Sequence, residues 1–266
     1  MSNLPRKTRV LILGRGRVGG ALARAWRRAG LRVRVAPGRS ATVSSQGFEV
    51  IVLAVPDGAV AGVASRLAAS LEVHRPLVAH CAGSLDLGPL EPLRRLGCPV
   101  GSLHPLQAVP SPAVRLSACA GIDASSAGAR RLLRSLASQA GLSPLSLDGA
   151  DRALYHAAAA LASNGLAGLL SRTEGLLRRC GASPRMARRA ALGLMSSALG
   201  RPLTGPIARG DARTVRAHVS ALARLAPEDL DLYVALARAQ IFLAQQQTGP
   251  TRGELAQVRA ALRASR

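Results

Sequence analysis

One segment near the start of the sequence constrains the fold more than any other. It reads VLILGRGRVGG over residues 10–20, so an apolar run of strand length leads directly into Gly14-x-Gly16-x-x-Gly19. An alanine-rich stretch of helical character follows the glycines. A strand, a glycine turn and a helix in this order form the context in which this motif binds dinucleotides. The alternative interpretation is a tight strand-to-helix turn that has no ligand.

Each glycine has its own physical reason in a dinucleotide-binding turn. Gly14 allows a sharp turn off the strand, Gly16 lets a pyrophosphate approach a backbone without Cβ, and Gly19 lets the helix pack closely on the sheet. The N–H groups and the positive dipole end of the new helix then face the phosphates. We therefore expect the diphosphate to lie over this turn, with Arg17 and Val18 at the start of the helix.

Strand and helix patterns alternate from here to residue 147. Apolar or alternating runs predict strands at residues 10–13, 31–35, 50–55, 77–81, 99–103, 118–122 and 142–147. Helices are expected at residues 18–29, from 57 to about 69, and at 127–140. This alternation favours the α/β class, with a doubly wound parallel sheet over residues 1–148 and ligands at the strand ends.

The loop after the second strand bears on the choice of cofactor. NAD-binding folds hold the ribose 2′-hydroxyl with an acidic residue about twenty positions after the glycines, and none stands here. Arg39 and Ser40 occupy that region, and both can bind a 2′-phosphate. NADP(H) is therefore favoured, the alternative being that Arg39 is a solvated loop residue. Val55 and Pro56, at the end of the third strand, complete the expected cofactor site.

Polar residues follow several of the predicted strands. Asp57 is expected to cap the helix after the third strand. His80 and His104 end two later strands, and an imidazole can relay a proton near neutral pH. For His80 we favour a structural histidine bonded to a loop carbonyl. For His104 a catalytic and a structural interpretation stand equal, since Pro105 is expected to fix the turn that presents it.

The second part of the chain, residues 149–266, has a helical pattern and no convincing strand. A long alanine-rich helix is expected over residues 152–179. Further helix starts are marked by Ser183-Pro184, Asp211, Pro227 and the capping box Thr251-x-x-Glu254. We expect an all-α domain that supplies the substrate side of a cleft.

Two segments of this helical part carry candidate site residues. His156, Ala160 and Asn164 are four residues apart and share one helix face, where the alanine leaves room for a small molecule. The alternative is a polar stripe that neighbouring helices satisfy. In the turn-rich loop of residues 203–211, Thr204 and Arg209 could hold a substrate carboxylate. Equally, Arg209 could simply pair with Asp211.

Composition limits the other function classes. The net charge of +22 suggests nucleic acid as a partner, but the arginines are spread along the chain and only 2% of residues are aromatic. We therefore disfavour nucleic acid, although a basic surface attracts an anionic dinucleotide. The four cysteines lack metal-ligand spacing and predict no metal site but reduced, mostly buried thiols of a cytoplasmic protein. No signal peptide and no membrane span are expected, because every apolar run is too short.

A set of motifs carries a resemblance to a known family. In order after the glycine turn stand VLAVPD at 52–57, HCAGS at 80–84, GSLHPL at 101–106, Tyr155-His156 with Asn164, and LTGPIARGD at 203–211. The set resembles the Rossmann-like oxidoreductases whose C-terminal helical domain is a domain of unknown function. They are similar in architecture to pyrroline-5-carboxylate reductase, ketopantoate reductase, and hydroxyisobutyrate and phosphogluconate dehydrogenases. The resemblance implies an NADP-type Rossmann domain, a helical domain that often forms a dimer, and Ser84 as a substrate contact.

The sequence departs from these relatives at the expected proton donor. Related hydroxyacid dehydrogenases and ketopantoate reductases carry a helical lysine four residues before an asparagine, and that position is Ala160 here. His156, one turn earlier, is the replacement candidate. His104-Pro105 resembles the His-Pro of prephenate dehydrogenases, but the glycine that follows there is Leu106 here.

The resulting expectation is an NADP(H)-dependent oxidoreductase of a small carbonyl, hydroxy or imine acid, with ketopantoate as a first guess. His156 would donate the proton, Asn164 would orient the acceptor group, and His104 would contact the substrate. The alternative is a catalytically inactive NADPH-binding regulatory or scaffold protein, which the missing helical lysine supports.

Overall fold

The computed structural model describes residues 8–38, 46–71, 73–247 and 249–263. The chain forms two compact units, Met1–Asn164 and Gly165–Arg266, each of which is described by itself. The sequence places the domain boundary at 148/149, where the sheet ends. The contacts instead group the helix that follows the sheet with the first unit, because its side chains bond to the strands.

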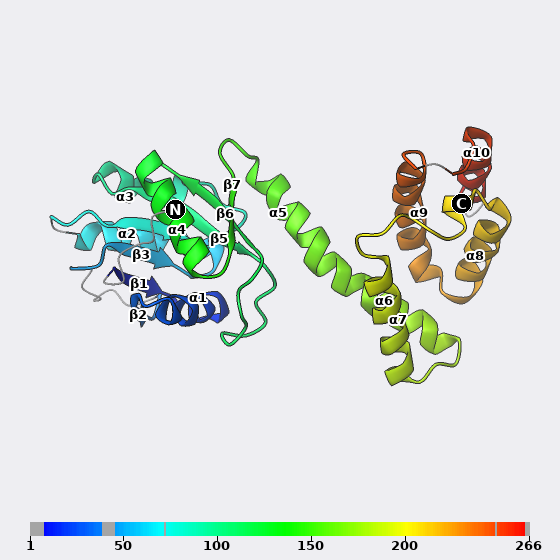
Figure 1. Cartoon of the computed structure of the whole chain (residues 1–266), viewed down its shortest axis with the longest axis horizontal. Coiled ribbons are helices and arrows are strands. Elements are labelled where there is room, and N and C mark those ends of the chain that lie inside the picture. Colours follow the sequence, from blue (N-terminus) through cyan, green and yellow to red (C-terminus); the bar gives the residue numbers. More distant parts are fainter. Residues whose placement is uncertain (1–7, 39–45, 72, 248, 264–266) are drawn as a thin grey trace. The chain divides into compact units, whose positions relative to one another are not determined.

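The first unit contains a seven-stranded sheet in the order β2-β1-β3-β4-β5-β6-β7 (Figure 1). The strands are β1 (Arg9–Leu13), β2 (Arg32–Ala36), β3 (Val50–Leu53), β4 (Leu77–His80), β5 (Val100–Leu106), β6 (Cys119–Ala124) and β7 (Ser143–Ser146). All neighbouring strands are parallel except β5 and β6. The α/β class is confirmed, with the correction that the sheet is mostly and not entirely parallel.

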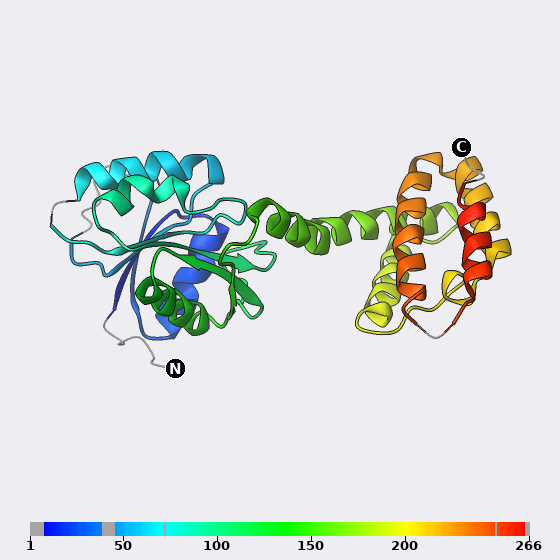
Figure 2. The same cartoon turned by 90° about the horizontal axis from the view of Figure 1, so that it is seen from above.

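Helices cover both faces of the sheet, α2 and α3 on one and α1 and α4 on the other (Figure 2). They are α1 (Arg17–Arg28), α2 (Val60–Ser70), α3 (Glu91–Arg95) and α4 (Ala127–Gln139). On the α1 face, the fully buried Trp26 donates its indole N–H to the carbonyl oxygen of Leu136 at 2.8 Å. Because both faces are covered, β3 and β4 are buried along their whole length, as their continuous apolar runs predict.

The rest of the described chain is helical. It comprises α5 (Arg152–Ala160), a π-helical turn (Leu161–Gly165), α6 (Leu166–Arg179), α7 (Pro184–Ala198), α8 (Ala212–Leu225), α9 (Leu230–Ala244) and α10 (Arg252–Ala261). The predicted caps are confirmed at Ser183, Asp211 and the Thr251–Glu254 capping box. Helices α8, α9 and α10 share one apolar core, so this all-α unit has a hydrophobic interior of its own.

One segment of the described chain, Arg152–Arg179, is long and apolar enough to cross a membrane by length and composition alone. The expectation of no membrane span therefore needs support from its contacts. Arg152 is buried between polar groups of the sheet, and Arg172 pairs with Asp229 of the second unit. Glu174 pairs with Arg188 of α7 at 3.0 Å. These contacts lie at or near the two ends of the segment, and the residues between them are largely exposed, so the expectation of no membrane span stays a prediction.

Candidate functional site

The glycine turn after β1 lies where the sheet changes direction. The chain leaves β1 for β2 on one side and continues to β3 on the other, and ligands of doubly wound sheets bind at such a switch point. Gly14 has a φ of +132°, and a Cβ there would collide with the carbonyl group of Ala54. A Cβ on Gly19 would collide with the Gly14 carbonyl oxygen. Both glycines are thus required by the packing of the turn.

Gly16 differs from these two glycines. It is exposed, its φ of −72° suits any residue, and a Cβ added there would meet no atom within 4 Å. It is the N-cap of α1, yet no side chain caps that helix and the first turn holds no carboxylate. The packing of the turn gives no reason for a glycine here, whereas the approach of a diphosphate to an uncapped helix end does. The turn therefore fits a dinucleotide.

The remaining predicted cofactor residues lie around this turn or outside the described residues. Val55 and Pro56 lie in the loop after β3, two and three residues beyond its end, Val55 half-buried and Pro56 exposed. A Cβ on Gly38, after β2, would collide with the Val55 side chain, so these two strand ends are close neighbours. Arg39 and Ser40 lie outside the described residues, and their contact with a 2′-phosphate stays a prediction.

Asp57 joins two strand-end loops and does not cap a helix. The predicted cap is wrong, because no side chain caps α2 or the preceding 3-10 turn Asp57–Ala59. Instead, the Ser84 hydroxyl donates a hydrogen bond to Oδ2 of Asp57 at 2.6 Å. This bond connects the loop after β4 with the loop after β3 and holds the half-buried Ser84 at the same edge of the sheet.

His80 at the end of β4 is fully buried, and Nε2 donates to the carbonyl oxygen of Asp86 at 2.9 Å. The predicted structural role, a bond to a loop carbonyl, is confirmed. Burial lowers the pKa of His80, so the ring is kept neutral. Its Nδ1 is buried without a partner among the described residues.

His104 lies inside β5, and the prediction that Pro105 fixes a turn after it is wrong. The strand continues in antiparallel register with β6, where His104 is opposite Gly121 and Pro105 is opposite Ala120. The parallel pairing of β4 with β5 ends at Ser102. Beyond that residue no strand in the described part of the chain pairs with the other side of β5, and such an edge tolerates a proline without an N–H group.

Three side chains from two elements meet at this point of β5. Nδ1 of His104 is 2.8 Å from the Tyr155 hydroxyl, and the two rings meet edge to face. The ring of His156 lies 6.1 Å from that of His104, between centroids. A Cβ on Gly83 would come within 2.8 Å of both His104 Nε2 and His156 Nδ1. The two nitrogens therefore face one space, and only glycine at position 83 leaves it open.

Tyr155 is a site residue that sequence reasoning missed. Its hydroxyl lies over Gly121, the residue opposite His104 in β6, and a Cβ at that glycine would crowd it. Half-burial raises the pKa of Tyr155, so it stays a protonated phenol. The available signal was an aromatic residue next to a histidine in a chain with only 2% aromatic residues.

A buried arginine holds the start of α5 against the sheet. The Arg152 side chain is 6% exposed, and Nη2 donates to Ser102 Oγ at 2.8 Å and to Asp123 Oδ2 at 3.0 Å. Ser102 belongs to β5 and Asp123 to β6. This contact places Tyr155 and His156, which follow within one helical turn, over the strand that carries His104.

The surroundings of His104 set its protonation. Burial is the main cause that lowers its pKa to about 4, and the neighbouring His156 and Arg152 lower it further, while Asp57 opposes them. His104 is therefore neutral near pH 7. A neutral imidazole that bonds Tyr155 through Nδ1 can present a hydrogen-bond donor or acceptor at Nε2.

Asn164 lies in the π-helical turn Leu161–Gly165. The expectation that His156, Ala160 and Asn164 share one face assumes an uninterrupted α-helix, and the π-turn shifts Asn164 away from that register. Asn164 is exposed, and no hydrogen bond joins its side chain to another residue that the structure describes. Its place near His156 is thus not supported, and its role stays a prediction.

Thr204 and Arg209 belong to the second unit, and both are exposed. Arg209 closes a short 3-10 turn and forms no ion pair in the described part of the chain. The alternative pairing with Asp211 is not observed, because this carboxylate caps α8 and accepts hydrogen bonds from Thr214. Arg209 is still near enough to help lower the pKa of the Asp211 carboxyl, and its role toward a substrate carboxylate stays a prediction.

The cysteines are free, as expected for reduced thiols, but only in part buried. Cys98 is buried, Cys81 and Cys119 are half-buried, and Cys180 is exposed. Burial raises the pKa of Cys81 to about 12, so this thiol is inert. Over the described ranges, no group of three or more His, Cys, Asp or Glu side chains could hold a metal ion.

Two family models match the chain. Residues 40–105 match a Rossmann-like domain, and residues 118–240 match a domain of unknown function, DUF2520. The chain thus carries a match to a Rossmann-like domain followed by a match to DUF2520. The resemblance drawn from the sequence motifs is thereby confirmed. The DUF2520 match begins before β6 and continues into α9, so it includes Tyr155, His156 and Asn164.

Solved structures share this fold at low sequence identity. A Bacteroides fragilis protein described as a candidate NADP oxidoreductase matches with a TM-score of 0.68 and 19% identity over 89% of this chain and 98% of that chain. A Thermotoga maritima protein matches with a TM-score of 0.66 and 16% identity, over 89% of this chain and 98% of that chain. Plasmodium falciparum pyrroline carboxylate reductase, solved with NADP bound, matches with a TM-score of 0.55 and 13% identity, over 98% of this chain and 97% of that chain. No curated protein sequence matches.

Proposed function

We propose that this chain is an NADP(H)-dependent oxidoreductase that reduces a small carbonyl or imine acid. The observation that carries the proposal is the neutral His104, bonded to Tyr155 and facing one space with His156, at the strand ends of a sheet with a dinucleotide turn. Proteins of this fold that bind or are named for NADP support it. When bound, the reduced nicotinamide supplies a hydride.

His104 is suited to orient and polarise the substrate. With the Tyr155 hydroxyl donating to Nδ1, the ring hydrogen is on Nε2, which faces the space shared with His156. A neutral imidazole in that state donates a hydrogen bond to a substrate oxygen or nitrogen. The bond strengthens as negative charge develops on that atom, which is the differential binding that catalysis requires.

His156 is the better proton donor of the two histidines. It is exposed, so it can exchange protons with water, and an imidazole can act as a general acid. Asn164 is proposed to orient the acceptor group, and Ser84 to contact the substrate. Thr204 and Arg209 of the second unit keep their proposed role toward a carboxylate, which is argued from that unit alone. Ketopantoate is the first 2-keto acid to test.

The preference for NADP(H) over NAD(H) rests on Arg39 and Ser40. No carboxylate is available after β2 to bind a ribose 2′-hydroxyl, and a guanidinium pairs well with a 2′-phosphate. The Arg39→Ala variant should weaken NADPH binding by about tenfold or more and leave NADH binding unchanged. Equal weakening of both cofactors would remove Arg39 from 2′-phosphate recognition.

The decisive experiment combines a fluorescence titration with NADPH and NADH and a stopped-flow assay of NADPH oxidation by keto acids and cyclic imines. We expect tight NADPH binding and turnover with at least one acid. The His156→Ala and Tyr155→Phe variants should bind NADPH normally but turn over about a hundredfold more slowly. NADPH binding without oxidation by any acid would support a regulatory or scaffold protein instead.

We also propose that a second copy of the chain covers the apolar helical surface. Leu154 of α5 and Leu161 directly after it, both in the first unit, define this surface and are 72% and 75% exposed. Apolar surface of this kind marks interaction sites, and in this fold class a homodimer accounts for it without a further partner.

A further inference from the structure

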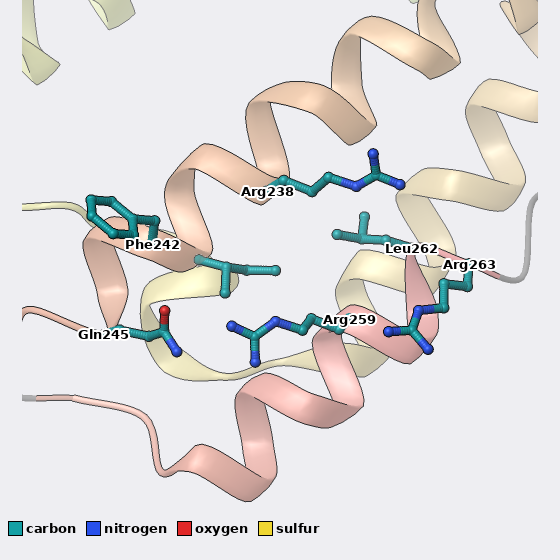
Figure 3. A pocket seen from close by; sticks show the side chains of 7 residues that line it. Arg238, Phe242, Gln245, Arg259, Leu262 and Arg263 are labelled. Atoms are coloured by element: carbon teal, nitrogen blue, oxygen red, sulfur yellow. The ribbon is translucent and has the colours of Figure 1, made fainter.

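The second unit contains a cavity that the proposed function does not use. Its volume is about 440 Å³, and residues of α9 and of the α10 end line it (Figure 3). Ile241 and Leu262 are buried and form its apolar floor. An adjoining cavity of about 650 Å³ shares Arg238, Leu262 and Arg263 with it. Together they have the size of a small-molecule site.

Three guanidinium groups surround the apolar floor. Arg238 comes from α9, Arg259 from α10 and Arg263 from its end, and Figure 3 shows Arg259 directed toward α9. None of the three guanidinium groups forms an ion pair or hydrogen bond with a residue that the structure describes. The one carboxylate at either cavity, Asp231 of the adjoining one, is not within ion-pair distance of them. The positive charge is therefore available to an anionic ligand.

Unpaired arginines are common in a chain with 36 basic and 14 acidic residues, so the arginines alone are not specific. The aromatic residue beside them, Phe242, is the more specific feature. The chain has five aromatic side chains, and Trp26, Phe48, Tyr155 and Tyr233 are buried or half-buried. Phe242 is 62% exposed, one helical turn after Arg238, and it lines the cavity. An exposed aromatic ring beside guanidinium groups is suited to stack on a flat ring.

From this juxtaposition we infer that the α9–α10 cavity binds a nucleotide, a flat base on Phe242 with its phosphates on Arg238, Arg259 and Arg263. Guanidinium groups bind phosphate oxygens in bidentate geometry, and the apolar floor accepts a ring edge. The site is built wholly within the second unit and requires neither the glycine turn nor the histidines. It stands whether or not the chain is an oxidoreductase.

Calorimetric titration with ATP tests this inference in the full chain carrying Gly16→Ala, which weakens the glycine turn as a competing nucleotide site. We expect binding with a Kd on the order of ten to a hundred micromolar. Arg259→Gln and Phe242→Ala should each weaken it by about tenfold or more. Arg252→Gln is the matched control, because this exposed arginine of the same helix lies outside the cavity lining.

Adenosine and inorganic triphosphate serve as half-ligands. Each should bind far more weakly than ATP if ring and phosphates are recognised together. Triphosphate that binds as tightly as ATP, or equal weakening by Arg252→Gln, would overturn the inference in favour of a diffuse basic surface. Tighter binding of oligoadenylate, lost in the same variants and steeply salt-dependent, would overturn it in favour of RNA. A change of oligomeric state in Phe242→Ala without loss of ATP binding would assign the ring to a protein interface.

Discussion

At the scale of single residues, the three glycines of the turn are not equivalent. At Gly14 and Gly19 an added Cβ would collide with other atoms of the protein, whereas a Cβ at Gly16 would meet no atom within 4 Å. Gly16→Ala should therefore leave the thermal midpoint unchanged and weaken NADPH binding by about tenfold or more, because the methyl group occupies diphosphate space. Calorimetry and fluorescence titration measure the two effects.

The matched control is Gly193→Ala in α7, where an added Cβ also meets no atom within 4 Å. It should leave NADPH affinity unchanged, while its thermal midpoint should not fall, because alanine is favoured over glycine inside a helix by about 1 kcal/mol. If Gly16→Ala binds NADPH as tightly as the intact chain, the motif is a strand-to-helix turn that binds no dinucleotide.

His104 links the site to the pH dependence of stability. Its pKa is about 4 in the folded chain against an ordinary value of 6.5, so the unfolded chain binds more protons between these values. The free energy of unfolding should therefore be full above about pH 6.5 and fall as the pH drops toward about 4. His104→Gln should flatten this fall in part, since the buried His80 contributes in the same direction.

Urea unfolding across this pH range measures the effect, with His218→Gln as the control because that histidine lies in the second unit.

The pH dependence of turnover should show no rise as His104 is protonated, because the neutral ring is the working form. A turnover rate that increases toward about pH 4 would identify His104 as the acid.

At the scale of elements, the buried pair between Arg152 and Asp123 fastens α5 to β6. Asp123→Ala would leave a guanidinium buried without its counter-charge and should cost about 3–5 kcal/mol of unfolding free energy. Arg152→Met removes the charge as well and should cost less. Both should slow turnover, because α5 carries Tyr155 and His156.

Chemical denaturation of the two variants and of the double variant measures this coupling. Glu91→Ala is a suitable control, since its ion pairs with Arg94 and Arg95 are exposed and such pairs contribute little. Equal costs for Asp123→Ala and Glu91→Ala would show that the buried pair does not fasten the helix.

At the scale of the whole molecule, the exposed leucines predict an oligomer. Light scattering on a sizing column should give a dimer for the intact chain. Leu154→Lys combined with Leu161→Lys should yield monomers, because charges cannot be buried in the apolar interface. Val73→Lys is the control, a residue 88% exposed in a loop after α2. A monomeric intact chain would contradict the proposed dimer.

The sequence by itself determined the α/β class, the glycine turn, the position of most elements to within a few residues, and the caps at Ser183, Asp211 and Thr251. These features depend on local periodicity and on side chains near the helix start. It could not determine which distant groups meet. Asp57 reads as a cap from its neighbours, but its carboxylate bonds Ser84, 27 residues away.

Only the tertiary structure decided the composition of the histidine site. Pairing with β6 extends β5 through Pro105. The contact of Arg152 with the sheet brings the Tyr155 hydroxyl to His104, and the π-turn shifts Asn164 out of the α-helical register. The same packing buried His104 and thereby lowered its pKa. Burial, strand register and approach between remote segments are properties of the folded chain, and no local pattern specifies them.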